Sequence, residues 1–142
     1  MNLINLKEQL LEMGSKINLQ VEEETKDYLT VHCEITAEKY FEGSIYFRTT
    51  VFASGTLHVF YTFNQRERTY DNLYLLNNFN AEHPWFKAYI ANINGKDYLE
   101  LHFSALSLKD EDEVVDTIGF LMNDLLEEDT LNLIKPILNS DK

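Results

Sequence analysis

The chain has little of several residues on which whole classes of protein depend. Cys33 is the one cysteine among 142 residues, so no disulfide forms within the chain, and a reducing compartment, the cytoplasm, is the expected location. Five glycines and two prolines provide no Gly- or Pro-rich linker, and the P-loop, GxGxxG and GxSxG patterns are absent. Nucleotide binding and serine hydrolysis therefore lack their usual sequence support.

Long apolar runs and a secretion signal are also missing. Segment 1–11 contains Lys7 and Glu8 inside an alternating apolar pattern, unlike the basic start and long apolar centre of a signal peptide. No stretch approaches the roughly twenty apolar residues that a membrane span requires. We expect no membrane association.

Basic residues are scarce relative to acidic ones. Twelve Lys and Arg residues face 24 Asp and Glu residues, which gives a net charge of -12. Such a charge repels phosphate backbones and anionic membrane surfaces, so direct nucleic-acid binding is not expected. It favours a basic protein partner or, in the extreme case, imitation of the charge of DNA, although many cytosolic proteins are moderately acidic without such a role.

Apolar residues, by contrast, continue along the whole chain. Hydrophobic residues make up 44% of the sequence and aromatic residues 13%, enough for one continuous core without help from disulfides or metal. No repeat and no internal boundary is visible, so we expect a single domain over residues 1–142.

Two periodicities alternate along the chain and predict its secondary structure. Apolar residues at steps of three and four indicate amphipathic helices, and steps of two indicate strands. Helical spacing occurs in 3–13, 73–79 and 110–126, with one more short turn at 131–138. Alternation predicts six strands, at 17–21, 29–35, 44–53, 56–64, 85–93 and 97–105, and the polar stretch 22–27 is predicted to connect the first two.

Turn and cap residues mark the ends of these elements. Ser54-Gly55 suits a tight turn, and Asn94-Gly95 favours a type I′ hairpin turn because both residues tolerate positive φ. Gly14 is placed to end the first helix, and Asp71 to cap the second. Four acidic residues at 110–113 crowd the first turn of the next helix, where the helix dipole favours negative charge.

The last turn has signals of its own. Asp129 or Thr130 is predicted to cap it, and Pro136 is predicted to break or bend it. The element order is therefore α-β-β-β-β-α-β-β-α, an α+β fold. Strands that neighbour in sequence predict a mainly antiparallel sheet of five to six strands with helices on one face.

The second half of the chain has a recognisable combination of motifs. A helix ends in an Asn-x-x-Asn pair, Asn77 and Asn80; a hairpin with the Asn94-Gly95 turn follows, and then the amphipathic helix with its acidic start. Over residues 70–126 this combination resembles the YbjN-like family, which is similar in fold to the chaperones of type III secretion systems. The resemblance implies a binding role, often through dimers or by holding another protein, without catalysis. We interpret the two asparagines as a helix end with its hydrogen bonds.

The histidines do not form a metal-binding motif in the sequence. His32, His58, His83 and His102 are scattered, without HxH, HxxxH or HExxH spacing. Three of them are out of phase with the apolar set of their strands and are predicted to share one sheet face, together with Tyr28, Glu34, Tyr98 and Glu100. A cluster there would give a metal site or a pH sensor, whereas solvated histidines on a strand are the simpler interpretation.

Other candidate chemistry also has a structural explanation. Cys33 lies in phase with Val31 and Ile35, which predicts a buried and inert thiol rather than a nucleophile. The acidic run 110–113 lacks the alternating ligands, central Gly and terminal Glu of a calcium loop. We expect no catalytic residue, no metal ligand and no cofactor.

Aromatic residues give the better indication of function. Five of them alternate with the core residues of their strands and so put apolar bulk on the second sheet face: Tyr46, Phe52, Phe60, Tyr89 and Tyr98. Surplus rings on a face that helices leave open suggest a dimer interface or a groove for a partner segment. The alternative is that these rings are cross-strand neighbours that stabilise an exposed sheet.

Three functional hypotheses follow. The first is a noncatalytic cytosolic binding protein, chaperone-like or regulatory, that binds a protein segment or a second copy of itself through this aromatic face or through its terminal helices. The second is a phage or mobile-element inhibitor whose carboxylates imitate nucleic-acid charge. The third is a small enzyme with a pocket that the sequence does not reveal.

Overall fold

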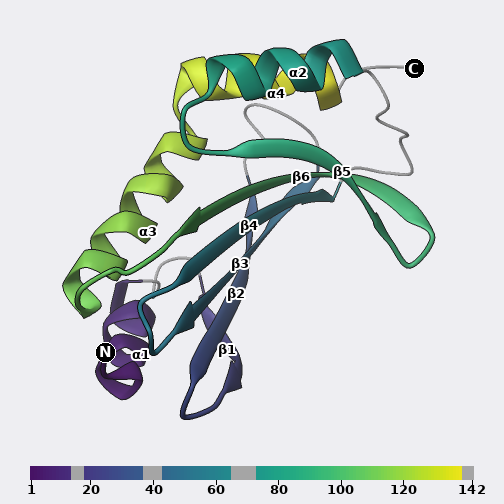
Figure 1. Ribbon diagram of the computed structural model, residues 1–142. Helices are drawn as coiled ribbons and strands as arrows, with labels where there is room; N and C mark the ends of the chain where they lie inside the picture. Colours follow the sequence, from purple (N-terminus) through teal and green to yellow (C-terminus); the bar gives the residue numbers. More distant parts are fainter. Residues whose placement is uncertain (14–17, 37–42, 65–72, 139–142) are drawn as a thin grey trace.

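The structure, a computed structural model, describes residues 1–13, 18–36, 43–64 and 73–138 and has an α+β architecture (Figure 1). The elements follow the predicted order. The strands are β1 Gln20–Glu24, β2 Tyr28–Thr36, β3 Ser44–Phe52, β4 Leu57–Asn64, β5 Lys87–Ile93 and β6 Lys96–Ala105. The helices are α1 Leu3–Met13, α2 Leu73–Glu82, α3 Glu111–Leu125 and α4 Glu128–Leu138.

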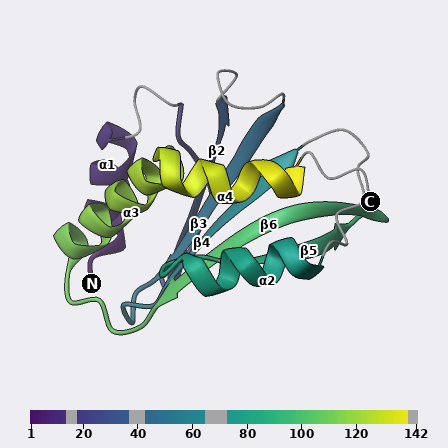
Figure 2. The same ribbon diagram turned by 90° about the horizontal axis from the view of Figure 1, so that it is seen from above.

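The six strands form one antiparallel sheet in the order β1-β2-β3-β4-β6-β5. Helix α2 connects β4 to β5, and β5 lies at the edge of the sheet, so β6 returns to pair with β4. Figure 2 shows the four helices lying over the same face of the sheet. The predicted antiparallel sheet with helices on one face is therefore confirmed.

The core lies between this face and the helices. Most of one side-chain phase of each central strand is buried there, including Phe47 of β3, Tyr61 of β4 and Leu101 of β6. The helices contribute their apolar stripes, among them Leu6 and Ile118. Period-two strands and period-3.6 helices thus meet in one hydrophobic cluster.

The acidic residues at 110–113 begin α3 as predicted, and Asp110 in addition serves as its N-cap. The Asp110 side chain accepts a hydrogen bond from the backbone N–H of Glu113 at 2.9 Å. In return, the Glu113 carboxylate accepts from the backbone N–H of Lys109 at 2.8 Å. One donor of the first turn, and the N–H of the residue before the cap, are therefore satisfied by side chains.

Both predicted glycine turns are present. Asn94 and Gly95 have φ of 54° and 82°, as a type I′ turn requires. Gly55 has φ of 98°, and its N–H donates to the carbonyl of Phe52 at 2.9 Å. The flanking strands end within two residues of their predicted bounds.

The first strand is present and pairs with β2 as the predicted hairpin, but its bounds were predicted wrongly, because it runs into the acidic stretch assigned to the connection. Strand β1 is Gln20–Glu24, and all five of its residues are exposed, so no buried face produces a period of two. Ion pairs hold it instead: Lys7 of α1 lies 3.0 Å from Glu24, and Arg48 of β3 lies 2.9 Å from Glu22.

The last helix is longer than the short turn that was predicted for it. Helix α4 begins at Glu128, so neither Asp129 nor Thr130 caps it, and it continues through Pro136 to Leu138. Thr130 is buried, and the apolar stripe of the helix packs into the core. Burial of this stripe explains why a full helix forms where capping signals alone predict a short turn. The predicted helix stop at Gly14, the cap at Asp71 and the strand start at 17 lie outside the described residues.

Gly55 and Gly95 provide a matched pair for testing how closely the β3–β4 turn packs. The carbonyl of Gly55 accepts from the N–H of Leu108 at 2.9 Å, and an added Cβ would lie 2.4 Å from the carbonyl oxygen of Leu108. At Gly95 an added Cβ meets nothing within 4 Å. Both sites have positive φ, which costs roughly 1–2 kcal/mol for an L residue.

We expect Gly55→Ala to lower the free energy of unfolding by at least about 1 kcal/mol more than Gly95→Ala, because only the former adds a backbone clash. Urea denaturation of both variants measures this difference. Equal losses would show that the segment around Leu108 does not hold the β3–β4 turn.

Candidate functional site

The sheet face opposite the helices is the main candidate for a functional surface. Apart from the buried Thr30, its side chains on β2, β3 and β6 are half-buried or exposed, whereas most of those of the other phase are buried. Because the strands are in antiparallel register, residues of this face form rows across the sheet. One row runs through five strands: Glu34 of β2, Tyr46 of β3, Thr62 of β4, Glu100 of β6 and Tyr89 of β5.

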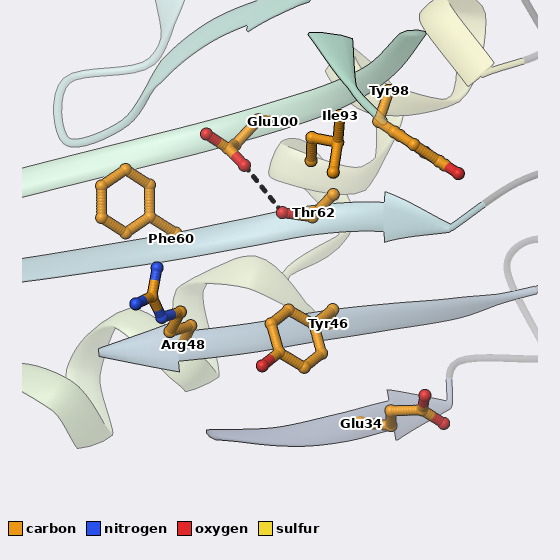
Figure 3. A pocket seen from close by; sticks show the side chains of 8 residues that line it. All are labelled: Glu34, Tyr46, Arg48, Phe60, Thr62, Ile93, Tyr98 and Glu100. Carbon is orange, nitrogen blue, oxygen red and sulfur yellow. Dashed lines mark hydrogen bonds between the residues drawn. The ribbon is translucent and has the colours of Figure 1, made fainter. Parts of the chain in front are cut away.

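A hollow of about 380 Å³ lies on this row (Figure 3). The short side chain of Thr62 lies at its centre, and larger side chains surround it. The lining residues are Glu34, Tyr46, Arg48, Phe60, Thr62, Ile93, Tyr98 and Glu100. The volume is at the lower end of the roughly 300–1,000 Å³ of small-ligand pockets, so the hollow has room for one or two side chains rather than a large cofactor.

The Glu100 carboxylate is held in a fixed orientation at the edge of the hollow. One oxygen accepts a hydrogen bond from the Thr62 hydroxyl at 2.8 Å, and the other accepts from the Tyr89 hydroxyl. Burial raises the pKa of Tyr89, and its hydrogen bond to Glu100 and the charge of Glu100 raise it further. The tyrosine thus remains the proton donor of this bond.

The single basic side chain among the described lining residues is already paired. Nε of Arg48 donates to a carboxylate oxygen of Glu22 at 2.9 Å, across from β3 to β1. Glu34 is exposed at the β2 side of the hollow. With the charges of Arg48 and Glu22 offsetting each other, the two remaining carboxylates make the hollow negative.

A ladder of stacked rings adjoins the hollow. The rings of Phe60 and His102 are nearly parallel, at 6°, with centroids 4.4 Å apart. Nδ1 of His58 lies 3.1 Å from Nε2 of His102, so one ring donates a hydrogen bond to the other. Burial lowers the pKa of His102, and so does the charge of His58, while Glu100 raises it.

The three strand histidines therefore share the open face, as their phase predicts. His32 lies apart from the other two and contacts Tyr46, with ring centroids 5.7 Å apart. Within the described residues, no group of three or more His, Cys, Asp and Glu side chains is arranged to hold a metal ion.

The five aromatic candidates all lie on this face but belong to three different arrangements. Tyr46, Phe60 and Tyr98 line the hollow. Tyr89 orients Glu100 from β5. Phe52 lies outside the hollow, with its ring 5.7 Å from that of Tyr28 and 6.3 Å from that of His58.

Sequence reasoning did not select Arg48, Thr62 and Ile93 as site residues. The strand phase of Arg48 and Thr62, alternate to the core residues, places them on the open face and was the available signal. Their convergence depends on which strands pair, and the period of a single strand does not contain that information.

His83 and Asp124 form a hydrogen-bonded pair between the end of α2 and α3. Nδ1 of His83 accepts hydrogen bonds from the backbone N–H groups of Trp85 and Phe86, at 3.2 and 3.1 Å. Its Nε2 therefore carries the proton and donates to Asp124 at 2.8 Å. Both ring nitrogens are engaged, so the pair fixes the turn after α2 against α3.

Cys33 and Asn80 have the structural roles that the sequence indicates. Cys33 is a free thiol, buried to 4% exposure, and burial raises its pKa to about 11. The Asn80 amide accepts from the backbone N–H of Ala88 at 2.6 Å and donates to its carbonyl at 3.1 Å. It thereby links α2 to the edge strand β5. Asn77 is exposed.

Comparisons of the chain with protein-family models, with curated proteins and with solved structures found no match. The resemblance to the YbjN-like family accordingly stays a prediction. Among the described residues, no helix has the length and apolar character needed to cross a membrane.

The contact between His58 and His102 leads to a prediction about their titration. We expect His58→Asn to raise the pKa of His102, because a neighbouring positive charge that opposes its protonation is removed. Proton NMR of the ring resonances measures this shift. His32→Gln, at a histidine that contacts a tyrosine instead, is the control and should leave His102 unchanged.

The lowered pKa also links stability to pH. Between that pKa and the ordinary value of about 6.5, the unfolded chain binds more protons at His102 than the folded chain, so this contribution to stability is complete above about pH 6.5 and is lost as the pH falls. Replacing His102 by Gln should reduce the loss of stability between pH 7.5 and 5.5, relative to the unmodified protein. An unchanged pH profile would contradict this assignment.

Proposed function

We propose that the chain is a noncatalytic binding protein that holds a segment of another protein on the open face of its sheet. The observation that supports this most directly is the hollow of about 380 Å³, with three aromatic rings in its lining, on the face that the helices leave uncovered. Tyrosine and phenylalanine rings contribute much of the buried core of protein interfaces.

The chemistry of the site favours binding over catalysis. The titratable groups of the hollow are two carboxylates, a paired arginine and tyrosines, without a histidine or cysteine among the described lining residues. Both oxygens of Glu100 already accept hydrogen bonds. Nearby, the rings of His102, Phe60 and His58 stack on one another in pairs, an arrangement that stabilises the sheet.

The YbjN-like resemblance of residues 70–126 supports the same proposal, since proteins with that fold hold other proteins or form dimers. We therefore propose a chaperone-like or regulatory role, with a second copy of the chain as an alternative occupant of the open face. A cytoplasmic location is part of the same proposal, since the chain has one cysteine and that thiol is buried.

Local structure explains the acidic runs that would suggest imitation of nucleic-acid charge, including the run 127–129, which lies at the start of α4. On β1, Glu22 and Glu24 pair with Arg48 and Lys7. At 110–113, the acidic residues begin and cap α3. No specific observation therefore favours the charge-mimic hypothesis over binding at the open face.

Capture of the tagged protein from a lysate of its native cells, followed by mass spectrometry, tests this proposal when it is made with matched variants. We expect Tyr46→Ala and Tyr98→Ala to weaken retention of a specific partner by about ten-fold, as removal of a central interface ring does. Tyr74→Ala is the control, because Tyr74 is 78% exposed on α2, on the helical side.

Light scattering of the same variants extends this test to self-association. Loss of a dimer in Tyr46→Ala and Tyr98→Ala, but not in Tyr74→Ala, would identify the occupant as a second copy. Retention of every partner by both hollow variants would contradict binding at the open face. A partner that leaves at high salt, whichever tyrosine is replaced, would support charge imitation instead.

A further inference from the structure

The hollow has a chemical preference that goes beyond protein binding in general. We infer, on the basis of the function proposed above, that it receives one positively charged side chain, a lysine or an arginine, of the bound segment. The inference depends on three features of the site: an oriented carboxylate, a surrounding set of rings, and the absence of an unmatched positive charge among the described lining residues.

The oriented carboxylate is that of Glu100. Its contacts with Thr62 and Tyr89 use one acceptor site on each oxygen, and a carboxylate offers about four such sites. Acceptor capacity therefore remains toward the hollow, and the side chain is already fixed before a ligand arrives. Glu34 supplies a second carboxylate from β2, on the far side of Tyr46 from Thr62 (Figure 3).

The rings add a second attraction for cations. Tyr46, Phe60 and Tyr98 come from three different strands and enclose the hollow from different sides (Figure 3). The face of an aromatic ring is negative, and it attracts a lysine or arginine head that lies within about 6 Å of the ring centroid. The methylene groups of the same side chain gain contact with Ile93, which is 39% exposed.

Charge excludes the opposite class of ligand. The charge of Arg48, the one basic residue among the described lining residues, is matched by Glu22 at 2.9 Å. Burial and the neighbouring His58 lower the pKa of His102 beside the hollow, which favours its neutral form. An acidic side chain or a phosphate would meet Glu34 and Glu100 on a protein of net charge -12.

Capped five-residue peptides of alanine with one central variable residue are suitable probes. The central residue is lysine, arginine, glutamate or norleucine, which keeps the length of lysine without its charge. Binding is followed by the shifts of backbone amide resonances in ¹H–¹⁵N NMR spectra of the full chain. We expect the lysine and arginine peptides to shift the amides of Thr62, Tyr98 and Glu100 in a saturable manner, and the norleucine peptide to bind at least about five-fold more weakly, as the loss of about 1 kcal/mol implies.

A pair of charge-matched variants separates a local contact from general attraction. Glu100→Gln keeps the size of the side chain and should weaken binding of the lysine peptide by about five-fold. Glu8→Gln gives the same change in net charge on α1, on the helix-covered side, and should leave it unchanged. The amide spectra of both variants also report whether they are folded.

Three outcomes would overturn the inference. They are equal binding of the norleucine and lysine peptides, equal weakening by Glu8→Gln and Glu100→Gln, and no shift at the hollow with any peptide. None of these outcomes bears on the capture experiment with Tyr46 and Tyr98, so the open face would still stand as a protein-binding surface if that experiment succeeds. The reverse result, peptide binding without an effect on capture, would leave a cation site and remove the proposed function.

Discussion

The register of the central strands is the constraint on which the rest of this structure depends. Side chains alternate between the two faces of a strand, so one register of β3 between β2 and β4 sends Phe47 and Val51 under the helices and Tyr46 and Arg48 to the open side. A slip by one residue would exchange the two sets. Burial of Phe47 and Val51 under α1 to α4 holds the strands in this register. The same register determines which side chains lie on the open face.

Helix α2 adds the step that assembles the hollow. Because α2 takes the chain to the edge of the sheet, β6 lies between β4 and β5, and Glu100 comes to face Thr62 on one side and Tyr89 on the other. Pairing of β4 with β5 would have separated these three residues. The contacts of α2 preserve this arrangement: Asn80 bonds the edge strand at Ala88, and His83 after the helix bonds Asp124 of α3.

The local signals of the sequence predict most of the secondary structure, because each depends on a few neighbouring residues. Asn94-Gly95 forms the hairpin turn, Asp110 lies at the start of α3, and Cys33 is buried as its phase indicates. The bounds of β1 were misplaced because an exposed edge strand has no buried face, and its ion-pair partners Lys7 and Arg48 lie in distant segments. The hollow could not be predicted for the same reason, because distant segments form it. Tyr46 and Tyr98 were recognised as surplus rings, but their approach to Thr62 depends on the strand order around α2.

The open face divides into two parts that need different explanations. Phe52, His58, His102 and Phe60 contact one another across strands, and this mutual stacking accounts for their presence without a ligand. Around the hollow, Tyr46 and Tyr98 surround the small Thr62. The hydrogen bonds of Glu100 with Thr62 and Tyr89 run along the wall of the hollow and do not fill its space. A larger residue than threonine would fill this position and bury the neighbouring rings, so stability of the sheet alone gives no reason for the hollow. The cationic side chain proposed above would supply that reason, because carboxylates and rings together attract a positive charge.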